Sequence, residues 1–246
     1  MTHGVRQIVR FNRPFYVGAS TGAALGVGAA AWLPLTAAPR GLILAATSLM
    51  LFWLGGSIAA SWVIYDRSRL TRWDWVAESL GFQPAAWINI HAGLDESTPM
   101  LRRLLGGSGR VFDIFDPAEM TEPSIARARR LSRNLIAAEP VDSRRLPAQS
   151  ASIDAVFLLL SAHELRTHDA RSALFAELRR ILTPGGRVVV AEHLRDVANF
   201  AAFGPGFLHF HSRRTWLCCF RTAQFLVHGE FRITPFIRVF ILRSAS

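Results

Sequence analysis

Two uncharged hydrophobic stretches near the N-terminus stand apart from the rest of the chain. Residues 15–38 and residues 42–65 contain no charged side chain. An α-helix rises about 1.5 Å per residue, so each stretch is long enough to cross a hydrocarbon core of about 30 Å. Gly18, Gly22 and Gly26 recur at four-residue spacing, which favours close packing against another helix. The pattern predicts a transmembrane helical hairpin within residues 1–72, with a turn at residues 39–41.

The arginines around this hairpin predict its orientation. Only Arg40 lies between the two stretches, whereas six arginines flank them: Arg6, Arg10, Arg13, Arg67, Arg69 and Arg72. Because positive side chains are enriched on the cytoplasmic side, both termini and the following domain are expected in the cytoplasm, at a bacterial inner membrane. A cleaved signal peptide is the alternative for the first stretch. The length of that stretch and the second one directly after it favour the hairpin.

From residue 73 onward, the hydrophobic positions follow the two periods of an α/β domain. Strands are expected at residues 86–91, 110–115, 152–161 and 187–192, with a terminal hairpin at 226–234 and 236–242. Apolar residues at three- and four-residue spacing predict helices at 73–80, 97–105, 124–133, 170–182 and 213–225. A strand, a helix and a strand over residues 152–192 make one βαβ unit of a parallel sheet.

Composition narrows the possible partners. The formal net charge is +10, and all 28 cationic residues are arginine. No interleaving of aromatic and basic residues of the kind that stacks bases accompanies them, so a basic surface facing anionic lipid is favoured over a nucleic-acid site. Cys218 and Cys219 are adjacent, cannot easily bridge one another, and fit a reducing compartment.

The second region resembles the class I S-adenosylmethionine-dependent methyltransferases that act on small and lipophilic molecules. The resemblance covers residues 73–246 and rests on these segments: Asp142 with Leu146-Pro147, residues 152–154, residues 177–186 and residues 190–192. It implies a Rossmann-like seven-stranded sheet with helices on both faces, and S-adenosylmethionine as the cofactor. The alternative is a sheet that has kept this skeleton without the chemistry.

The glycine loop departs from the family pattern. The family's acidic residue and Gly-x-Gly-x-Gly would align with Asn89, His91, Gly93 and Asp95, so only the middle glycine is present. The resemblance implies that Asn89, Ala92, Gly93 and the N–H groups of the helix starting near Ser97 face the cofactor. Either this loop holds the cofactor in a modified way, or the domain no longer binds it.

Other cofactor positions follow from the same resemblance. Asp116, preferred over Asp113 because it lies past the apolar run, matches the acid that accepts hydrogen bonds from the ribose. Asp142 matches the acid that contacts the adenine, and Ser161 ends the fourth strand beside the pocket.

Histidines gather where the strands should end. Methyl transfer requires a positioned nucleophile and removal of its proton, a task that suits histidine near neutral pH. His163 follows the fourth strand and His193 follows the fifth, with Glu192 beside it, so these three are the predicted catalytic residues. His209 and His211 lie further along, but no third ligand at a telling spacing accompanies them, and no metal site is predicted.

These observations predict a membrane-anchored methyltransferase. Its substrate is expected to be a lipophilic small molecule, such as a quinone, isoprenoid, lipid or tetrapyrrole precursor. The rival interpretation is a non-catalytic relative that joins a membrane protein complex. The altered glycine loop favours the rival, whereas the acids and the histidines favour the enzyme.

Overall fold

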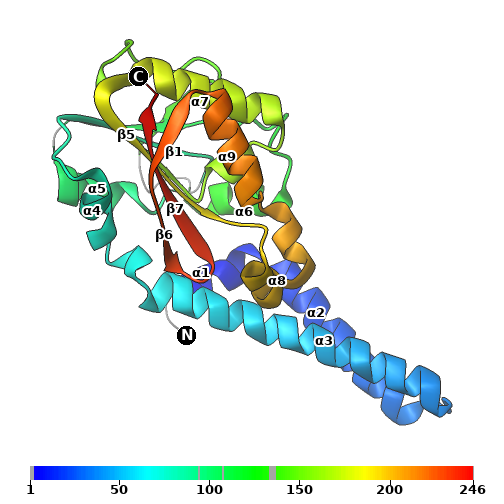
Figure 1. Ribbon diagram of the computed structural model, residues 1–246. Coiled ribbons are helices and arrows are strands. Elements are labelled where there is room, and N and C mark those ends of the chain that lie inside the picture. Colours follow the sequence, from blue (N-terminus) through cyan, green and yellow to red (C-terminus); the bar gives the residue numbers. More distant parts are fainter. Residues whose placement is uncertain (1–2, 94, 107, 133–136, 246) are drawn as a thin grey trace. The chain divides into compact units, whose positions relative to one another are not determined.

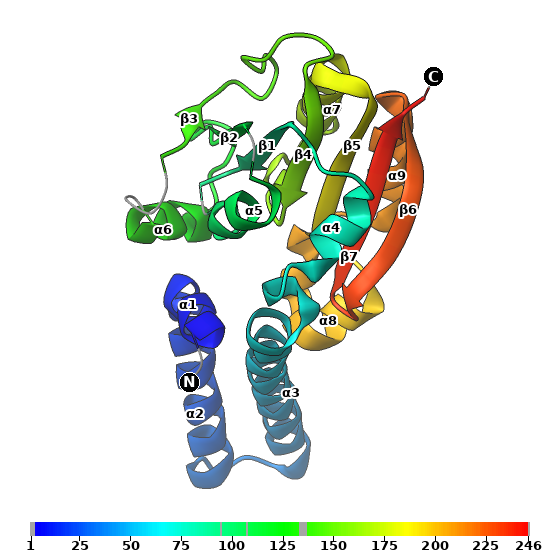
Figure 2. The same cartoon turned by 90° about the vertical axis from the view of Figure 1, so that its left-hand side faces the viewer.

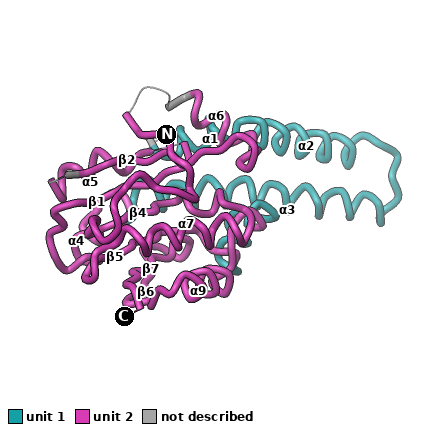
Figure 3. The backbone as a smooth tube through the Cα atoms, turned by 90° about the horizontal axis from the view of Figure 1, so that it is seen from above, with its two compact units in different colours: residues 1–68, 196–207 teal, residues 69–195, 208–246 magenta. Residues whose placement is uncertain are grey.

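The computed structural model describes residues 3–93, 95–106, 108–132 and 137–245. It consists of two compact units, coloured separately in Figure 3. The first unit comprises residues 1–68 and 196–207, and the second comprises residues 69–195 and 208–246. The boundary predicted between residues 72 and 73 stays a prediction. No pattern in the sequence indicated that residues 196–207 would join the N-terminal segment.

The first unit is helical. It contains α1 (His3–Phe11), α2 (Arg13–Trp32), α3 (Ala37–Trp62), the π-helix η1 (Val63–Arg67) and α8 (Val197–Phe203). Asp66 in η1 accepts hydrogen bonds from the N–H groups of Gly4 and Val5, so η1 caps the first turn of α1.

The break between α2 and α3 lies earlier than the expected turn at residues 39–41. Leu33 is extended because it precedes Pro34, whose ring disfavours helical backbone in the residue before it. Pro39 instead lies in the first turn of α3, where its missing N–H breaks no helical hydrogen bond. The predicted stretches 15–38 and 42–65 are therefore corrected to helices 13–32 and 37–62, and Arg40 belongs to α3.

Helices α2 and α3 pack against each other along their length. A Cβ on Gly26 would overlap the Oγ1 atom of Thr47 in α3, so this glycine permits the close approach, whereas Gly18 has nothing within 4 Å. The two helices leave much apolar surface exposed, including Trp32, Leu25 and Leu42. Among the described residues, one helical segment, Ala37–Thr71, is long and apolar enough to cross a membrane.

Helix α8 belongs to this unit through contacts with α3. The ring of Phe200 packs edge-on against Trp53 at 5.5 Å between centroids. Gly204, which follows α8, has a φ of 54° and lies against the same indole, where a Cβ would approach within 2.6 Å. The chain therefore leaves the second unit after Arg195, contacts the long apolar helix, and returns at Leu208.

The second unit is a seven-stranded sheet in the order β3-β2-β1-β4-β5-β7-β6. The strands are β1 (Ala86–His91), β2 (Ser108–Asp113), β3 (Glu139–Pro140), β4 (Ile153–Leu159), β5 (Leu182–His193), β6 (Phe225–Thr234) and β7 (Ile237–Ser244). The first five strands in chain order pair in parallel, and β7 pairs antiparallel with both β5 and β6. The predicted Rossmann-like fold is confirmed, including its terminal antiparallel pair (Figures 1 and 2).

The α-helices of this unit are α4 (Asp74–Leu80), α5 (Thr98–Leu105), α6 (Pro123–Ser132), α7 (His168–Ile181) and α9 (Arg213–Thr222). Its short helices are η2 (Arg69–Thr71), η3 (Ala162–Glu164) and η4 (Gly204–His209). Helix η4 begins in the first unit and ends in the second. The expected helix at residues 124–133 corresponds to α6, and Arg133 lies outside the described residues.

Central strands explain the continuous apolar runs in the sequence. Val156, Phe157 and Leu158 of β4 are all fully buried, because both faces of the sheet are covered. Helix α7 buries the periodic apolar side chains that predicted it, and Thr167 caps it by accepting a hydrogen bond from the N–H of Ala170. Since β1, β2, β4 and β5 are parallel, their carboxyl ends meet at one edge of the sheet.

Candidate active site

A buried carboxylate organises the carboxyl end of β4. Glu192 of β5 is fully buried, and its Oε1 accepts hydrogen bonds from the N–H groups of Ser161, Ala162 and His163 at 3.1, 2.8 and 3.2 Å. Its Oε2 lies 2.6 Å from Nδ1 of His163. Glu192 thus fixes both the backbone of η3 and the imidazole of His163, so two of the three predicted catalytic residues form one unit.

The protonation of His163 follows from this partner. Burial disfavours a charged imidazole, but the negative charge of Glu192 and the hydrogen bond to it outweigh burial and raise the pKa of His163 to about 9. The imidazole of His163 is therefore held protonated near neutral pH in the ligand-free protein. In that form, Nε2 of His163 donates a proton and does not accept one.

His193 has different neighbours. Its ring stacks on Phe210 with centroids 4.7 Å apart, and its Nδ1 lies 3.1 Å from the backbone carbonyl of Phe236. A backbone carbonyl is an acceptor, so Nδ1 carries the proton in this hydrogen bond. His193 is buried at the end of β5, as predicted, and its catalytic role remains a prediction.

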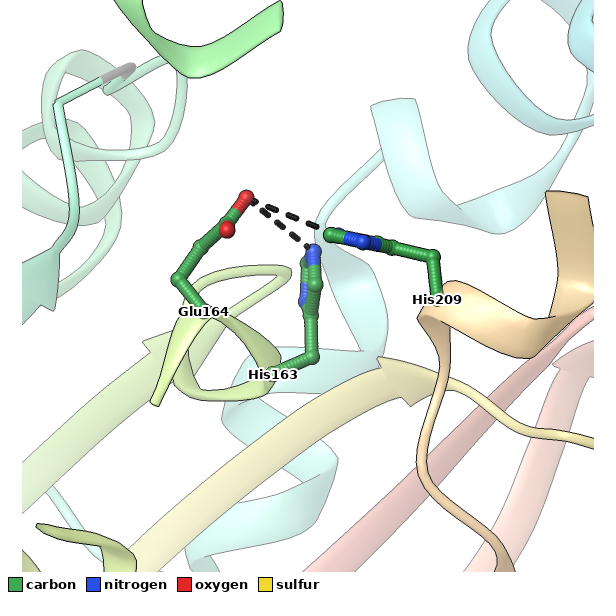
Figure 4. Close-up of side chains that lie close together, drawn as sticks. All are labelled: His163, Glu164 and His209. Carbon is green, nitrogen blue, oxygen red and sulfur yellow. Dashed lines mark ion pairs between the residues drawn. The ribbon is translucent and has the colours of Figure 1, made fainter. Parts of the chain in front are cut away.

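His163, Glu164 and His209 form a second cluster at the same edge (Figure 4). Oε1 of Glu164 lies 3.5 Å from Nε2 of His163 and 3.8 Å from Nε2 of His209. His209 comes from the segment before α9, 45 residues beyond Glu164 in the chain, and no local spacing could have indicated this grouping. His211, by contrast, lies against Arg171, and burial together with that cation lowers the pKa of His211 to about 3.

The altered glycine loop has a structural explanation. Oδ1 of Asp95 accepts hydrogen bonds from the N–H groups of Ser97 and Thr98 at 3.0 and 2.9 Å, which caps the N-terminus of α5. Nδ2 of Asn89 donates to Asp95, Ser97 and Thr98. Asn89 and Asp95 therefore hold β1 to the start of α5, and the amide of Asn89 is fully buried in that network.

The side chain of Arg129, on α6, packs against the altered glycine loop at Gly93. Gly93 has a φ of 112°, and a Cβ on it would approach the side chain of Arg129 within 2.5 Å. Nη1 of Arg129 lies 2.7 Å from Oδ2 of Asp113, at the end of β2, and its guanidinium stacks 4.0 Å above the ring of Phe115. His91 accepts a hydrogen bond from the N–H of Gly93 through Nδ1.

The other predicted cofactor residues lie in distinct settings. Asp116 and Asp142 are exposed, and each accepts a hydrogen bond from the N–H two residues further on, as turn-forming aspartates do. Ser161 is buried and donates from Oγ to the carbonyl of Ile90, which ties β4 to β1. Ala92 is buried after β1. The roles of all four in binding cofactor remain predictions.

Asp113 was the second choice, after Asp116, for the acid that contacts the ribose. It is half-buried at the last position of β2, with Oδ1 3.9 Å from Nδ1 of His91, whereas the expected strand ran two residues further, to residue 115. The pairing of His91 with Asp113 across β1 and β2 places this carboxylate at the strand end. Asp113 is thus a second candidate, beside the predicted Asp116, for the acid that contacts the cofactor.

Comparison with known proteins agrees with this geometry. Residues 93–190 match the family model of a methyltransferase domain. The match covers about two fifths of the chain, and class I methyltransferase domains use S-adenosylmethionine as their cofactor. A search of curated proteins found no match.

Solved structures share the fold at low sequence identity. A SAM-dependent methyltransferase from Aquifex aeolicus is 17% identical, with a TM-score of 0.54 over 73% of this chain and 94% of that one. A geranyl diphosphate C-methyltransferase from Streptomyces coelicolor is 14% identical, with a TM-score of 0.52 over 71% of this chain and 79% of that one. The [4+2]-cyclase SpnF is 15% identical, with a TM-score of 0.52 over 71% of this chain and 80% of that one. At these identities the likeness shows the fold alone.

The residues at the β1 and β2 ends fit this cofactor. Asp113 offers the carboxylate that ribose hydroxyls require, and Gly93 allows close approach of the backbone. Nε2 of His91 is buried and has no hydrogen-bond partner among the described residues. Because Nδ1 accepts from Gly93, Nε2 carries the proton and is available to donate it to a ligand. Arg129 must move away from Asp113, or share it, for the ribose to bind.

Proposed function

We propose that this protein is a membrane-anchored S-adenosylmethionine-dependent methyltransferase whose acceptor is a lipophilic small molecule. The observation that carries the proposal is the pairing of His163 with Glu192 at the carboxyl ends of β4 and β5. His163 lies within the residues that match the methyltransferase family model, and Glu192 follows them by two positions. Ligands of open α/β sheets bind at this edge, so a polar centre buried there is placed for chemistry.

Asp113, Gly93 and His91 would hold the cofactor in this proposal, together with the predicted residues Ala92 and Ser161. The bound cofactor supplies an electrophilic methyl group on a sulfonium. The protein then has to orient the acceptor and exclude water, because in-line displacement depends mainly on positioning.

His163 and His193 face the acceptor in this proposal, and Glu192 orients His163. Glu192 is fully buried and both of its oxygens are engaged, so it acts through His163 and not directly on the acceptor. His193 and Phe210 supply a flat aromatic surface next to it, which suits an apolar or conjugated acceptor.

The apolar surface of the first unit supports the membrane anchor. Trp32, Leu42 and Leu25 are 85%, 73% and 69% exposed, and large exposed apolar surfaces mark sites of contact with a membrane or a partner. The flanking arginines favour both termini and the domain on the cytoplasmic side of a bacterial inner membrane. A membrane would also be the source of a lipophilic acceptor.

The lipophilic acceptor has one further support from a fold neighbour. One solved structure with this fold is named for methylation of geranyl diphosphate, an isoprenoid.

A non-catalytic subunit of a membrane complex is the second candidate. The placement of Arg129 against Gly93 and Asp113 favours it, because the cofactor must displace that side chain. Titration of the purified full chain in detergent with S-adenosylmethionine and with S-adenosylhomocysteine separates the two candidates. Micromolar binding, followed by transfer of a labelled methyl group to a membrane lipid extract, is expected of the enzyme. If the chain binds neither ligand at millimolar concentration, the enzyme is excluded and the non-catalytic subunit is the remaining candidate.

Reporter fusions test the anchor separately. A fusion in the α2–α3 loop at residue 34 is expected to report the periplasm, and a fusion after residue 245 is expected to report the cytoplasm. A cytoplasmic signal from the loop position would contradict the hairpin.

A further inference from the structure

We propose that His163, Glu164 and His209 bind a divalent transition-metal ion of the zinc class. The three side chains offer two imidazole nitrogens and one carboxylate oxygen, and these ligand atoms lie within 4.8 Å of one another. Figure 4 shows the carboxylate of Glu164 directed toward both imidazole rings.

The distances are close to those of a coordination sphere. Bonds of about 2.0–2.2 Å at tetrahedral angles put neighbouring ligand atoms about 3.3–3.6 Å apart. The two Glu164 distances are 3.5 and 3.8 Å, so small rotations of the side chains would close the set around an ion. Three protein ligands leave one position open, which is the arrangement of a reactive metal site and not of a structural one.

A buried atom without a partner points to a missing ligand. Oε2 of Glu164 is buried and makes no hydrogen bond within the described part of the chain. Leaving a carboxylate oxygen unsatisfied in the interior is costly, and a bound cation removes that cost.

The carboxylates near Nδ1 of His163 and His209 support the metal site. Nδ1 of His163 lies 2.6 Å from Glu192, and Nδ1 of His209 lies 3.8 Å from Oε1 of Glu122. Metal-ligating histidines usually donate their second nitrogen to a carboxylate, which fixes the tautomer and turns the other nitrogen toward the ion. His163 has this arrangement, whereas His209 has a carboxylate near its Nδ1 that lies beyond hydrogen-bond distance. In both rings, Nε2 is the nitrogen near Glu164.

Arg166 holds the two segments together. Its Nη1 donates to the backbone carbonyls of His163 and His209, so the residues on either side of the cluster share one guanidinium. Its charge opposes a cation, but Glu122, Glu164 and Glu192 place three carboxylates around the same point. Imidazole ligands favour zinc, iron, cobalt or nickel over magnesium, which prefers oxygen ligands alone.

The site would act on the methyl acceptor, and this role rests on the proposed function. A cation with an open position lowers the pKa of a hydroxyl that binds it, so the hydroxyl proton leaves to solvent and the remaining oxygen is a stronger nucleophile. Nε2 of His163 would then be a ligand and would not take the proton itself.

Metal binding to the full chain in detergent tests the inference without cofactor or acceptor. After treatment with a chelator, the protein is titrated with Zn²⁺ and, in parallel, with Co²⁺, whose visible absorption reports the geometry. One ion per chain is expected. His209→Ala and Glu164→Gln are expected to weaken binding at least tenfold, and Glu122→Gln is expected to weaken it by about tenfold to a hundredfold. Elemental analysis after desalting gives the stoichiometry.

His168→Ala is the matched control, because His168 lies four residues after Glu164 and its side chain is 53% exposed outside the cluster. It is expected to bind zinc like the parent. Thermal unfolding in detergent monitors the fold of each variant, so a variant that keeps the Tm of the parent but loses zinc supports the site. Zinc affinity in His209→Ala equal to that of the parent would overturn it, as would no zinc binding in the parent at micromolar concentration.

Discussion

Nδ1 of His163 lies 2.6 Å from Oε2 of Glu192, although 29 residues separate them in the chain. The carboxylate is fully buried and also accepts three backbone N–H groups of the segment that carries the histidine. One side chain of β5 therefore sets both the backbone and the ring position at the end of β4.

The first prediction concerns this carboxylate. Glu192→Ala removes the acceptor of a buried imidazolium, and breaking a buried ion pair costs about 3–5 kcal/mol of unfolding free energy. Denaturant unfolding of the full chain in detergent measures this loss. Glu139→Ala, which breaks an exposed pair with Arg110, is the control and is expected to cost about 1 kcal/mol or less. A loss for Glu192→Ala as small as that of the control would contradict the role assigned to Glu192.

A second prediction concerns the two histidines. Replacing the histidine that acts on the acceptor by alanine is expected to lower turnover by about a hundredfold to ten-thousandfold, with cofactor affinity nearly unchanged. His163→Ala and His193→Ala are compared with His168→Ala on the identified acceptor. Full activity in both single variants and in the double variant would remove both residues from the mechanism.

The acid that contacts the ribose is the subject of a third prediction. Asp113 lies at the strand end and Asp116 in an exposed turn, so we expect Asp113→Asn to weaken binding of S-adenosylhomocysteine about tenfold or more. Calorimetric titration of Asp113→Asn and of Asp116→Ala with S-adenosylhomocysteine distinguishes the two residues. Tenfold weaker binding in Asp116→Ala, with Asp113→Asn unchanged, would restore the choice made from the sequence.

Arg129 gives a fourth prediction. Its hydrogen bond to Asp113 must be given up or shared when ribose hydroxyls bind, and a charge-assisted bond is worth about 1.5–3 kcal/mol. Arg129→Ala is therefore expected to bind S-adenosylhomocysteine more tightly, by about tenfold. Arg127→Ala on the same helix serves as the control. Weaker binding in Arg129→Ala would mean that the guanidinium itself holds the cofactor.

The last prediction concerns acid stability. A hydrogen bond from Arg180 holds the pKa of Glu177 below its ordinary value of 4.5, and the N–H of Leu146 donates to the same carboxylate. A lowered pKa in the folded state adds stability at pH above about 4.5, and this stability is lost as the pH falls through the lower, folded value. The difference in Tm between the parent and Glu177→Gln should therefore shrink toward zero as the pH falls below 4. A constant difference between pH 7 and pH 3 would contradict this.

Much of the fold was readable from local pattern. The first strand, predicted at residues 86–91, is β1 with the same limits, because adjacent residues form a short, continuously buried run that ends at a turn. The helix predicted at residues 73–80 ends where expected, at Gly81, whose φ of 70° a side chain would resist. Periodicity fixes such elements because it depends on neighbours within a few residues.

Contacts between distant residues decided the site. The sequence alone indicated His163, His193 and Glu192 at the strand ends, but only the sheet register pairs Glu192 with His163. Arg129 reaches Asp113 from a helix 16 residues away, and His209 joins Glu164 from beyond β5. Pairings of this kind depend on the path of the whole chain and leave no local spacing to read. The sequence by itself therefore determined the elements and the edge where they meet, and the tertiary structure decided which polar groups share that edge.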